Sequence, residues 1–318
     1  MEAPSPGLKL RTAAWSIVVD RWTAEVVSAL HERQIRCILL KGPAVSRWLY
    51  SDEPAARRYN DIDLLIQSTN FSAARDVLRA LGFLARSVVL ERERPQHAEL
   101  WVRTDGAQVD LHRRIHGTED VDEDRLWKAV TDGSEKLNVG DVQVEIPGET
   151  VRLLHVVLHL DVKDKPGSQA WIDLERAVQH VDDESWRRMA KLAYSLRIEP
   201  IVGERLRRVP LARPLAIKLE LPASGSAYMT IRTAVERDGD SPQLYSIFRL
   251  SRLPTPKAKL EYVVQKLFPP RVFMRHTSAL ARRGAPGLAL AYVTRLLWLL
   301  LKLPGAIFAW KRVKRRLS

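Results

Sequence analysis

The chain has 318 residues, a formal net charge of +13 and a hydrophobic content of 46%. This composition excludes a wholly disordered chain, and a single cysteine excludes a disulfide framework. The charge is concentrated at one end, because residues 251–318 hold 15 basic residues against one acidic residue, Glu261. The positive charge therefore belongs to a C-terminal extension of an otherwise near-neutral protein.

Up to residue 148 the pattern mixes helices with strands. Apolar residues at steps of three and four predict helices over residues 13–34, 44–50 and 71–81. Short apolar or alternating runs predict strands over residues 37–40, 61–66, 99–103, 108–115 and 139–146. The acidic run at residues 119–124 is interpreted as a solvated face or a helix start rather than a metal site.

After Pro147 the pattern becomes helical, with helices predicted over residues 151–160, 171–181, 185–196 and 201–209. The expected fold class is α+β: a mixed sheet flanked by helices, then an all-α domain and a basic, apolar C-terminal helical tail. The predicted domains are an α/β domain at residues 1–148, a helical domain at 149–250 and a basic, apolar region at 251–318.

Three further features bear on location. Cys37 lies in an apolar run, which favours a buried thiol over a nucleophile and fits a reducing cytoplasm. The N-terminus has neither the basic nor the apolar region of a signal peptide. Near the other end, Arg295 and Lys302 interrupt an apolar stretch and Pro304 is expected to break it, so the sequence predicts no membrane-spanning helix.

The most informative segment is the predicted strand at residues 61–66. Side chains alternate along a strand, so Asp61 and Asp63 lie on one face and repel each other unless a cation lies between them. Mg²⁺ prefers a few carboxylates together with phosphate oxygens. Asp110, flanked by two apolar residues, adds a third strand carboxylate, and the strand that runs into Lys41 and Gly42 suits a phosphate.

Each of these features has a plainer interpretation when it is taken alone. An Asp-x-Asp sequence is common, and Lys-Gly before a helix often marks only a tight turn. The ordered set is more specific: an apolar strand into glycine, then an acid pair in a second strand, then a third strand acid after a hairpin turn.

This ordered set resembles the nucleotidyltransferase fold of the polymerase-beta type. More closely, Leu39-Leu40-Lys41-Gly42, Arg57, the block at residues 61–66 and Val109-Asp110-Leu111-His112 look like the bacterial group of uncharacterised nucleotidyltransferases. The likeness continues through the helical segments at residues 154–159 and 171–174 and through Trp186, and it covers residues 30–210. One departure is Pro43, which stands where that fold has a second glycine or a serine and which lacks an N–H for a phosphate.

The resemblance implies a nucleotide-binding, metal-binding transferase that moves a nucleoside monophosphate from an NTP to an acceptor hydroxyl or other group. Asp61, Asp63 and Asp110 would be the catalytic residues and the metal ligands, with two Mg²⁺ ions, or Mn²⁺ in their place. Lys41, Gly42 and Arg57 would bind the nucleotide. The acceptor, which is a small molecule, a peptide or a protein, remains open.

Four more residues are candidates for the acceptor side: His112, His155, His159 and Asp173. His112 lies two residues after Asp110 on the same face of the strand and could contact the acceptor or a metal, and a plain hydrogen-bonding role is an equal alternative. His155 and His159 have the spacing of a zinc pair, but helix packing or lining of the acceptor pocket is favoured because a third ligand is not evident. Asp173 could hydrogen-bond one of these two histidines.

Two other functions compete with catalysis. A module of the same fold without turnover, antitoxin-like or a scaffold, is favoured by Pro43 and opposed by the three retained acids. The tail fits an interfacial membrane segment on an anionic surface or a helix packed on the helical domain, and nucleic acid is a weaker partner. The expected location is cytoplasmic, at the inner face of the membrane if the tail binds lipid.

Overall fold

The computed structural model describes residues 6–85, 98–161 and 164–223, and within the C-terminal part 246–247, 250, 255–269, 271, 274–275 and 278–315. The chain divides into two compact units. Unit 1 comprises Met1–Arg86 and His97–Ser224, and unit 2 comprises Ser87–Gln96 and Gly225–Ser318. Because the α/β and helical parts both lie in unit 1, the domain boundary near residue 148 stays a prediction.

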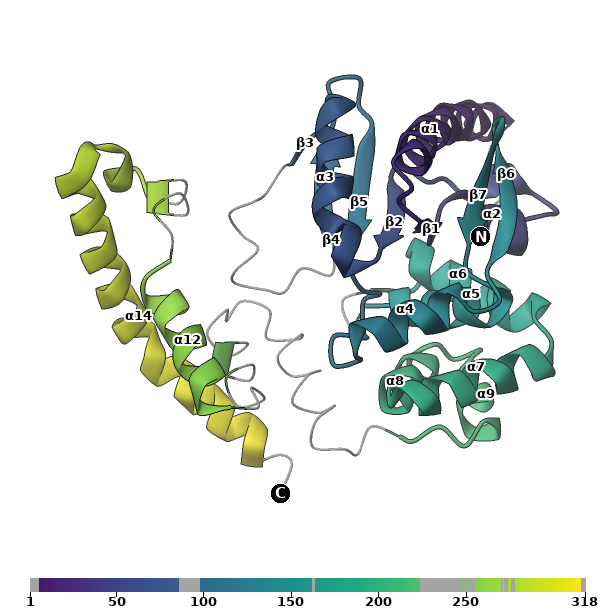
Figure 1. The fold of residues 1–318 in the computed structure, drawn as a ribbon. Helices are drawn as coiled ribbons and strands as arrows, with labels where there is room; N and C mark the ends of the chain where they lie inside the picture. The colour runs from purple at the N-terminus through teal and green to yellow at the C-terminus, as the bar shows by residue number, and fades with distance from the viewer. Residues whose placement is uncertain are drawn as a thin grey trace. The chain divides into compact units, whose positions relative to one another are not determined.

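Unit 1 is built on a five-stranded mixed sheet, which confirms the predicted architecture (Figure 1). Its strands are β1 (Cys37–Leu39), β2 (Ile62–Ile66), β3 (Leu84–Ala85), β4 (Ala98–Val102) and β5 (Gln108–His112), in the spatial order β1-β2-β5-β4-β3. The central pair β2 and β5 is parallel, whereas the other neighbours are antiparallel. The parallel register sets Asp63 directly opposite Asp110.

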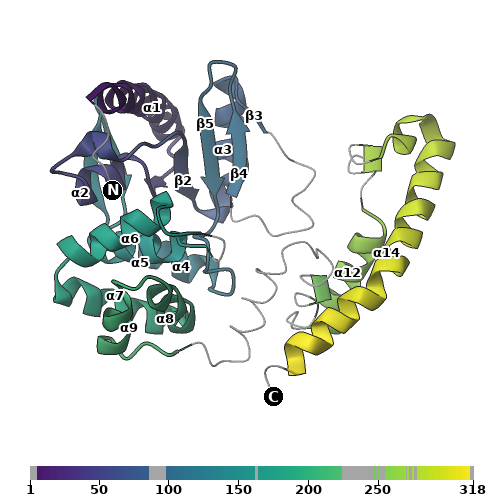
Figure 2. The ribbon, with the colours of Figure 1, turned by 180° about the vertical axis from the view of Figure 1, so that it is seen from behind.

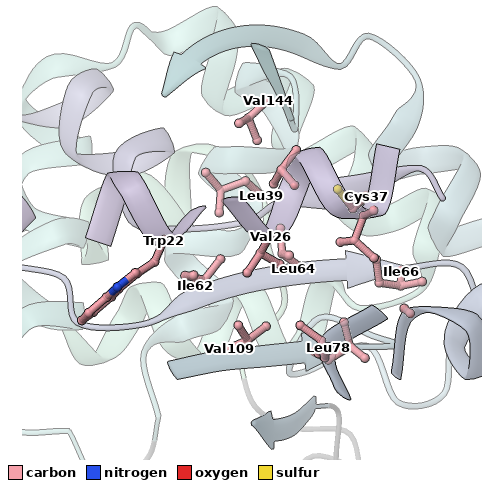
Figure 3. Packing of buried hydrophobic residues seen from close by; sticks show 14 of the residues in the cluster. Trp22, Val26, Cys37, Leu39, Ile62, Leu64, Ile66, Leu78, Val109 and Val144 are labelled. Carbon is pink, nitrogen blue, oxygen red and sulfur yellow. The ribbon is translucent and has the colours of Figure 1, made fainter. Parts of the chain in front are cut away.

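One face of this sheet carries the main hydrophobic core. The helices α1 (Pro6–Glu32) and α3 (Phe71–Ala80) cover it with side chains such as Trp22, Val26 and Leu78, which pack on Ile62 and Leu64 of β2 (Figure 3). Because side chains alternate along β2, burial of Ile62 and Leu64 on this face turns Asp63 to the opposite face. The core therefore fixes the direction of the central carboxylate.

Three sequence predictions for unit 1 can be compared with the structure here. The strand expected over residues 139–146 is a hairpin of β6 (Glu135–Val139) and β7 (Val142–Ile146), and its turn contains Gly140 at a φ of 61°. The acidic run does begin a helix, because Asp122 caps α4 (Glu123–Thr131) by accepting a hydrogen bond from the Arg125 backbone N–H at 3.0 Å. Cys37 is buried, as expected.

The remaining helices of unit 1 gather below the sheet in both views (Figures 1 and 2). The four predicted helices appear with shifted ends, and a short fifth one was missed. They are α5 (Glu149–His159), α6 (Gln169–His180), α7 (Asp183–Leu196), α8 (Glu199–Arg208) and α9 (Arg213–Lys218). Before α5, the chain passes α2 (Pro43–Leu49), which begins one residue before the predicted start, and two 3-10 turns, η1 (Pro54–Ala56) and η2 (Ser68–Asn70).

In unit 2, the helix α12 (Pro256–Leu267) is followed by η3 (Leu280–Arg282) and the long helix α14 (Gly284–Arg315). The expected break at Pro304 is wrong, because the helix continues through this residue. The fixed φ of proline is compatible with a helix, and the cost of its missing N–H is one backbone hydrogen bond. The stretch Gly284–Gly305 has the length and composition of a membrane-spanning helix. This corrects the sequence-based exclusion of such a helix.

Candidate active site

The site is assembled where β1 ends and β2 begins. Gly42 has a φ of 61°, a left-handed conformation that favours glycine, and an added Cβ would lie 3.4 Å from the Tyr59 ring. The Leu40 backbone N–H donates to the Asp63 carbonyl at 2.9 Å, which ties the end of β1 to β2. This turn brings the Lys41 side chain to the Asp63 carboxylate.

Asp63 is the buried centre of the site, with 1% of its surface exposed. Its Oδ1 accepts from the Lys41 ammonium at 2.8 Å and lies 2.9 Å from His112 Nε2. Its Oδ2 is also buried, and among the described residues it has no hydrogen-bond partner. Burial alone would raise the pKa of Asp63, but Lys41 and His112 hold it well below its usual range, so this carboxylate is ionised.

Two more carboxylates surround Asp63. Burial, then repulsion from Asp63, raises the pKa of Asp61 to about 6 despite the opposing charge of Lys41. The same two causes raise the pKa of Asp110. Three carboxyl groups thus lie close together, and the positive charge of Lys41 acts on each of them. Ionisation of Asp61 and Asp110 beside the charged Asp63 is disfavoured unless a further cation binds.

These side chains fit a divalent cation. Ligand atoms of Asp63, Asp110 and His112 lie within 4.8 Å of one another, and the unsatisfied Asp63 Oδ2 is a buried oxygen that lacks a donor or a cation. Oxygen ligands of this kind suit Mg²⁺ or Mn²⁺. Of the three predicted ligands, Asp63 and Asp110 belong to this group, and Asp61 lies close enough for their charges to raise its pKa.

His112 was expected to contact the acceptor or a metal, or to make a plain hydrogen bond, and the structure places it against Asp63 and within the candidate metal group. The signal for this was present in the sequence. Because His112 lies two residues after Asp110 on β5, both side chains project from the same face of the strand.

Arg57 and Asp173 were assigned to the nucleotide and the acceptor, respectively, but the structure joins them in a buried ion pair. The Arg57 guanidinium donates to both carboxylate oxygens of Asp173, at 3.0 Å from Nε and 2.8 Å from Nη2. Asp173 also accepts from the Tyr50 hydroxyl at 2.7 Å and from the Gln169 amide at 2.8 Å. The network links the loop before β2 to α6.

Within the described part of the chain, these three donors supply every hydrogen bond to Asp173, so the expected bond to a histidine is wrong. Sequence reasoning missed Tyr50 and Gln169 as partners. Tyr50 lies 123 positions from Asp173, so that contact is visible only in the fold. Gln169 lies one helical turn before Asp173 on α6, so its spacing was a signal that the sequence offered.

His155 and His159 lie on α5 at the same centre. His155 Nδ1 is 3.2 Å from the Leu40 carbonyl, and a carbonyl only accepts, so this nitrogen carries the proton. Burial, then the positive charge of Lys41, lowers the pKa of His155 to about 3 and that of His159 well below its ordinary value. Both imidazoles are therefore neutral, with ring centroids 6.1 Å apart. Among the described residues, the candidate metal group consists of Asp63, Asp110 and His112. The choice between pocket lining, packing and zinc for His155 and His159 stays a prediction.

The mixed sheet with carboxylates on its two central parallel strands defines a nucleotidyltransferase-like protein with a candidate acidic metal site. A family model described as uncharacterised nucleotidyltransferase matches residues 12–211. The chain belongs to this family, which confirms the resemblance seen in the sequence.

Comparison with curated proteins gives no match. Among solved structures, the antibiotic-resistance factor ANT(2'')-Ia is similar at 13% identity, over 58% of this chain and 94% of its own, with a TM-score of 0.40. An antigenic nucleotidyltransferase-like protein from Paracoccidioides brasiliensis is similar at 16% identity, over 58% of this chain and 92% of its own, with a TM-score of 0.33. Likeness at this level says nothing about the substrate.

Proposed function

We propose that the protein is a metal-dependent enzyme that transfers a nucleoside monophosphate from an NTP to an acceptor hydroxyl or other group and releases pyrophosphate. The observation that carries this proposal is the buried, ionised Asp63 between Asp61 and Asp110, whose excess negative charge calls for cations. Family membership supplies the class of reaction.

In this reaction the acceptor oxygen attacks the α-phosphorus, the bond to the bridging oxygen breaks, and pyrophosphate leaves with that electron pair. Asp110, whose pKa is raised, takes the acceptor proton. Divalent cations held by Asp61, Asp63 and Asp110, two Mg²⁺ or Mn²⁺, would neutralise charge on the triphosphate and lower the pKa of the acceptor hydroxyl.

The other residues position these groups. His112 orients the Asp63 carboxylate through their hydrogen bond. The Lys41 ammonium, which contacts Asp63 and lies next to the turn at Gly42, also contacts the triphosphate when the nucleotide binds. The predicted contact of Arg57 with the nucleotide is replaced in this proposal by a positioning role, because its guanidinium is held by Asp173.

The acceptor approaches from the side of α5. His155 and His159 are neutral, and the charges of Lys41 and Asp63 influence the pKa of both. His155 donates from Nδ1 to the Leu40 carbonyl, so its Nε2 is left to accept a hydrogen bond from the acceptor without adding charge. We place the protein in the cytoplasm, where NTP is available and the lone Cys37 stays reduced. The C-terminal region is proposed to touch the inner face of the membrane.

The test is transfer of label from α-³²P-labelled NTPs, in the presence of Mg²⁺ or Mn²⁺, to components of a cell extract. Label should appear in an acceptor from α-labelled but not from γ-labelled nucleotide. Asp61→Asn and Asp63→Asn should abolish the transfer, whereas the exposed, distant Asp141→Asn serves as the matched control. Undiminished transfer by either site variant would overturn the assignment.

A module without turnover is the second candidate, and the specific observation in its favour is Pro43 at the start of α2, where it offers no N–H to a phosphate. Calorimetry with NTP and Mg²⁺ separates the two candidates. Saturable binding without any transfer of label would favour the module, while transfer that depends on Asp63 would exclude it.

A further inference from the structure

The exposed apolar face of α14 is the strongest surface feature of unit 2. Leu290, Val293, Leu297 and Leu301 are 50%, 52%, 55% and 80% exposed, respectively. Their spacing of three, four and four residues puts them on one side of the helix, where they form a stripe about three turns long. Isolated exposed apolar residues are ordinary, but a continuous stripe of this length marks a contact surface.

The opposite face of α14 packs within unit 2 along the first part of the helix, up to Arg295. Ala291 packs in a small core with Met274 and Ala281. The Tyr292 hydroxyl donates to the Pro269 carbonyl at 2.5 Å, and Arg295 donates to the Lys266 carbonyl at 3.3 Å. Arg295 is therefore drawn toward α12, and Lys302, seven residues later, lies on the same side of the helix. The exposed stripe is left free of charge.

The surroundings of the stripe are strongly cationic. Residues 264–283, which precede α14, carry five basic and no acidic residues, and residues 306–318 again carry five basic and no acidic residues. An apolar helix face between two cationic ends matches an anionic lipid surface, because apolar burial and electrostatic attraction then add.

The same charges decide between lying on a bilayer and crossing it. Although the stretch Gly284–Gly305 is long enough to cross, crossing would move one of two equally basic flanks to the far side. Basic flanks remain on the cytoplasmic side, so a helix with two of them is retained there at both ends.

We propose that α14 is an in-plane membrane anchor, which lies on the cytoplasmic leaflet of an anionic bilayer with Leu290, Val293, Leu297 and Leu301 in the apolar layer. The choice of leaflet rests on the proposed function, because use of NTP keeps unit 1 on the cytoplasmic side. The anchor itself is independent of catalysis, and it would concentrate the enzyme near acceptors at the membrane surface.

The first experiment measures sedimentation of the full chain with vesicles of phosphatidylcholine alone or mixed with phosphatidylglycerol. The chain should bind the anionic vesicles, and binding should weaken at about 1 M salt, where charges are screened beyond about 3 Å. Leu297→Glu with Leu301→Glu should reduce the partition coefficient by about tenfold or more. The matched control is Leu211→Glu with Ile217→Glu, where two side chains that are 44% and 67% exposed gain the same two charges.

Because the substituted side chains are exposed, the variants should fold, and equal unfolding midpoints in urea verify this. As a second readout, Leu297→Cys labelled with an environment-sensitive dye should shift its emission to the blue on anionic vesicles. Absence of binding by the full chain would overturn the proposal. So would a dimer that the double substitution dissociates without any vesicle binding, since the stripe would then belong to a second copy.

The orientation is tested in cells with Ser318→Cys and a membrane-impermeant maleimide. Labelling should require lysis, and alkaline extraction should release the protein from membranes, whereas labelling of intact cells or retention after extraction would show a spanning helix and refute the in-plane placement. Asp63→Asn should bind vesicles as the wild type does. Vesicle binding without nucleotidyl transfer would therefore refute only the proposed function, and transfer without vesicle binding only the anchor.

Discussion

Replacement of Asp61 by asparagine should stabilise the metal-free protein at neutral pH even though it removes catalysis. Asp61 lies partly buried beside Asp63 and Asp110, and burial is the main cause that raises its pKa from the ordinary 3.8 to about 6. A carboxyl whose pKa is higher in the folded than in the unfolded state favours folding only while it is protonated.

The sign and size follow from that shift. The stabilising contribution is fully present below about pH 4 and is lost as the pH rises through about 6, the pKa of Asp61 in the folded protein. A pKa shift of about two units corresponds to about 3 kcal/mol in the free energy of unfolding. Asparagine has nearly the same shape and cannot ionise, so Asp61→Asn should escape this loss.

The assay is urea unfolding followed by circular dichroism in EDTA, at about pH 4 and about pH 8, on either side of the transition. The variant and the wild type should unfold alike at the lower pH, and the variant should be more stable by up to about 3 kcal/mol at the higher pH. Mg²⁺ should stabilise the wild type more than the variant, since bound cations relieve the repulsion.

The exposed control Asp141→Asn should change stability by less than about 0.5 kcal/mol at both pH values. If Asp61→Asn unfolded at the same urea concentration as the wild type in EDTA at about pH 8, repulsion among the three carboxylates would not describe this site.

Three other experiments test separate parts of the site. Lys41→Met should lower the free energy of unfolding by about 3 kcal/mol, because Asp63 loses its buried cation, and adding Asp63→Asn should restore part of this loss in a urea double-mutant cycle. Arg57→Lys and Asp173→Asn should each lower the melting temperature and reduce the free energy of unfolding by about 3 kcal/mol, while the KM for NTP changes by less than about twofold. A large rise in KM without thermal destabilisation would instead support the predicted contact of Arg57 with the nucleotide. Pro43→Ser should lower the Kd for NTP by about two- to tenfold in calorimetry, the value of one added hydrogen bond, and an unchanged Kd would show that phosphate does not meet this position.

The sheet could be predicted because its information is local. The alternation along residues 61–66 and the turn at Gly42 depend only on residues next to each other in the sequence. They therefore identify the strands and their faces without knowledge of the rest of the chain. The prediction of one strand over residues 139–146 failed for a related reason. Gly140 and Asp141 form a turn inside a run that otherwise alternates between apolar and polar residues, and the partner strand β6 is largely exposed and polar.

The partners of Arg57 could not be predicted, since their contact depends on how α6 packs against the loop before β2. The charge of Arg57 was visible in the sequence, but a buried guanidinium and one that binds phosphate have the same sequence pattern. Burial decides between them: Arg57 is 4% exposed and satisfied by a carboxylate, which is the arrangement that permits a buried charge.

The acidic residues differ in function because their environments differ, not because their sequence contexts do. Asp63 keeps its charge because Lys41 and His112 contact one of its oxygens. Asp61 and Asp110 are only partly buried, and within the described part of the chain Lys41 forms its ion pair with Asp63 rather than with either of them. The ionised Asp63 raises the pKa of both neighbours. A cation that enters this cluster therefore meets one ready ligand, Asp63, and a second, Asp61, that releases a proton below about pH 6, so its affinity should rise with pH through about 6.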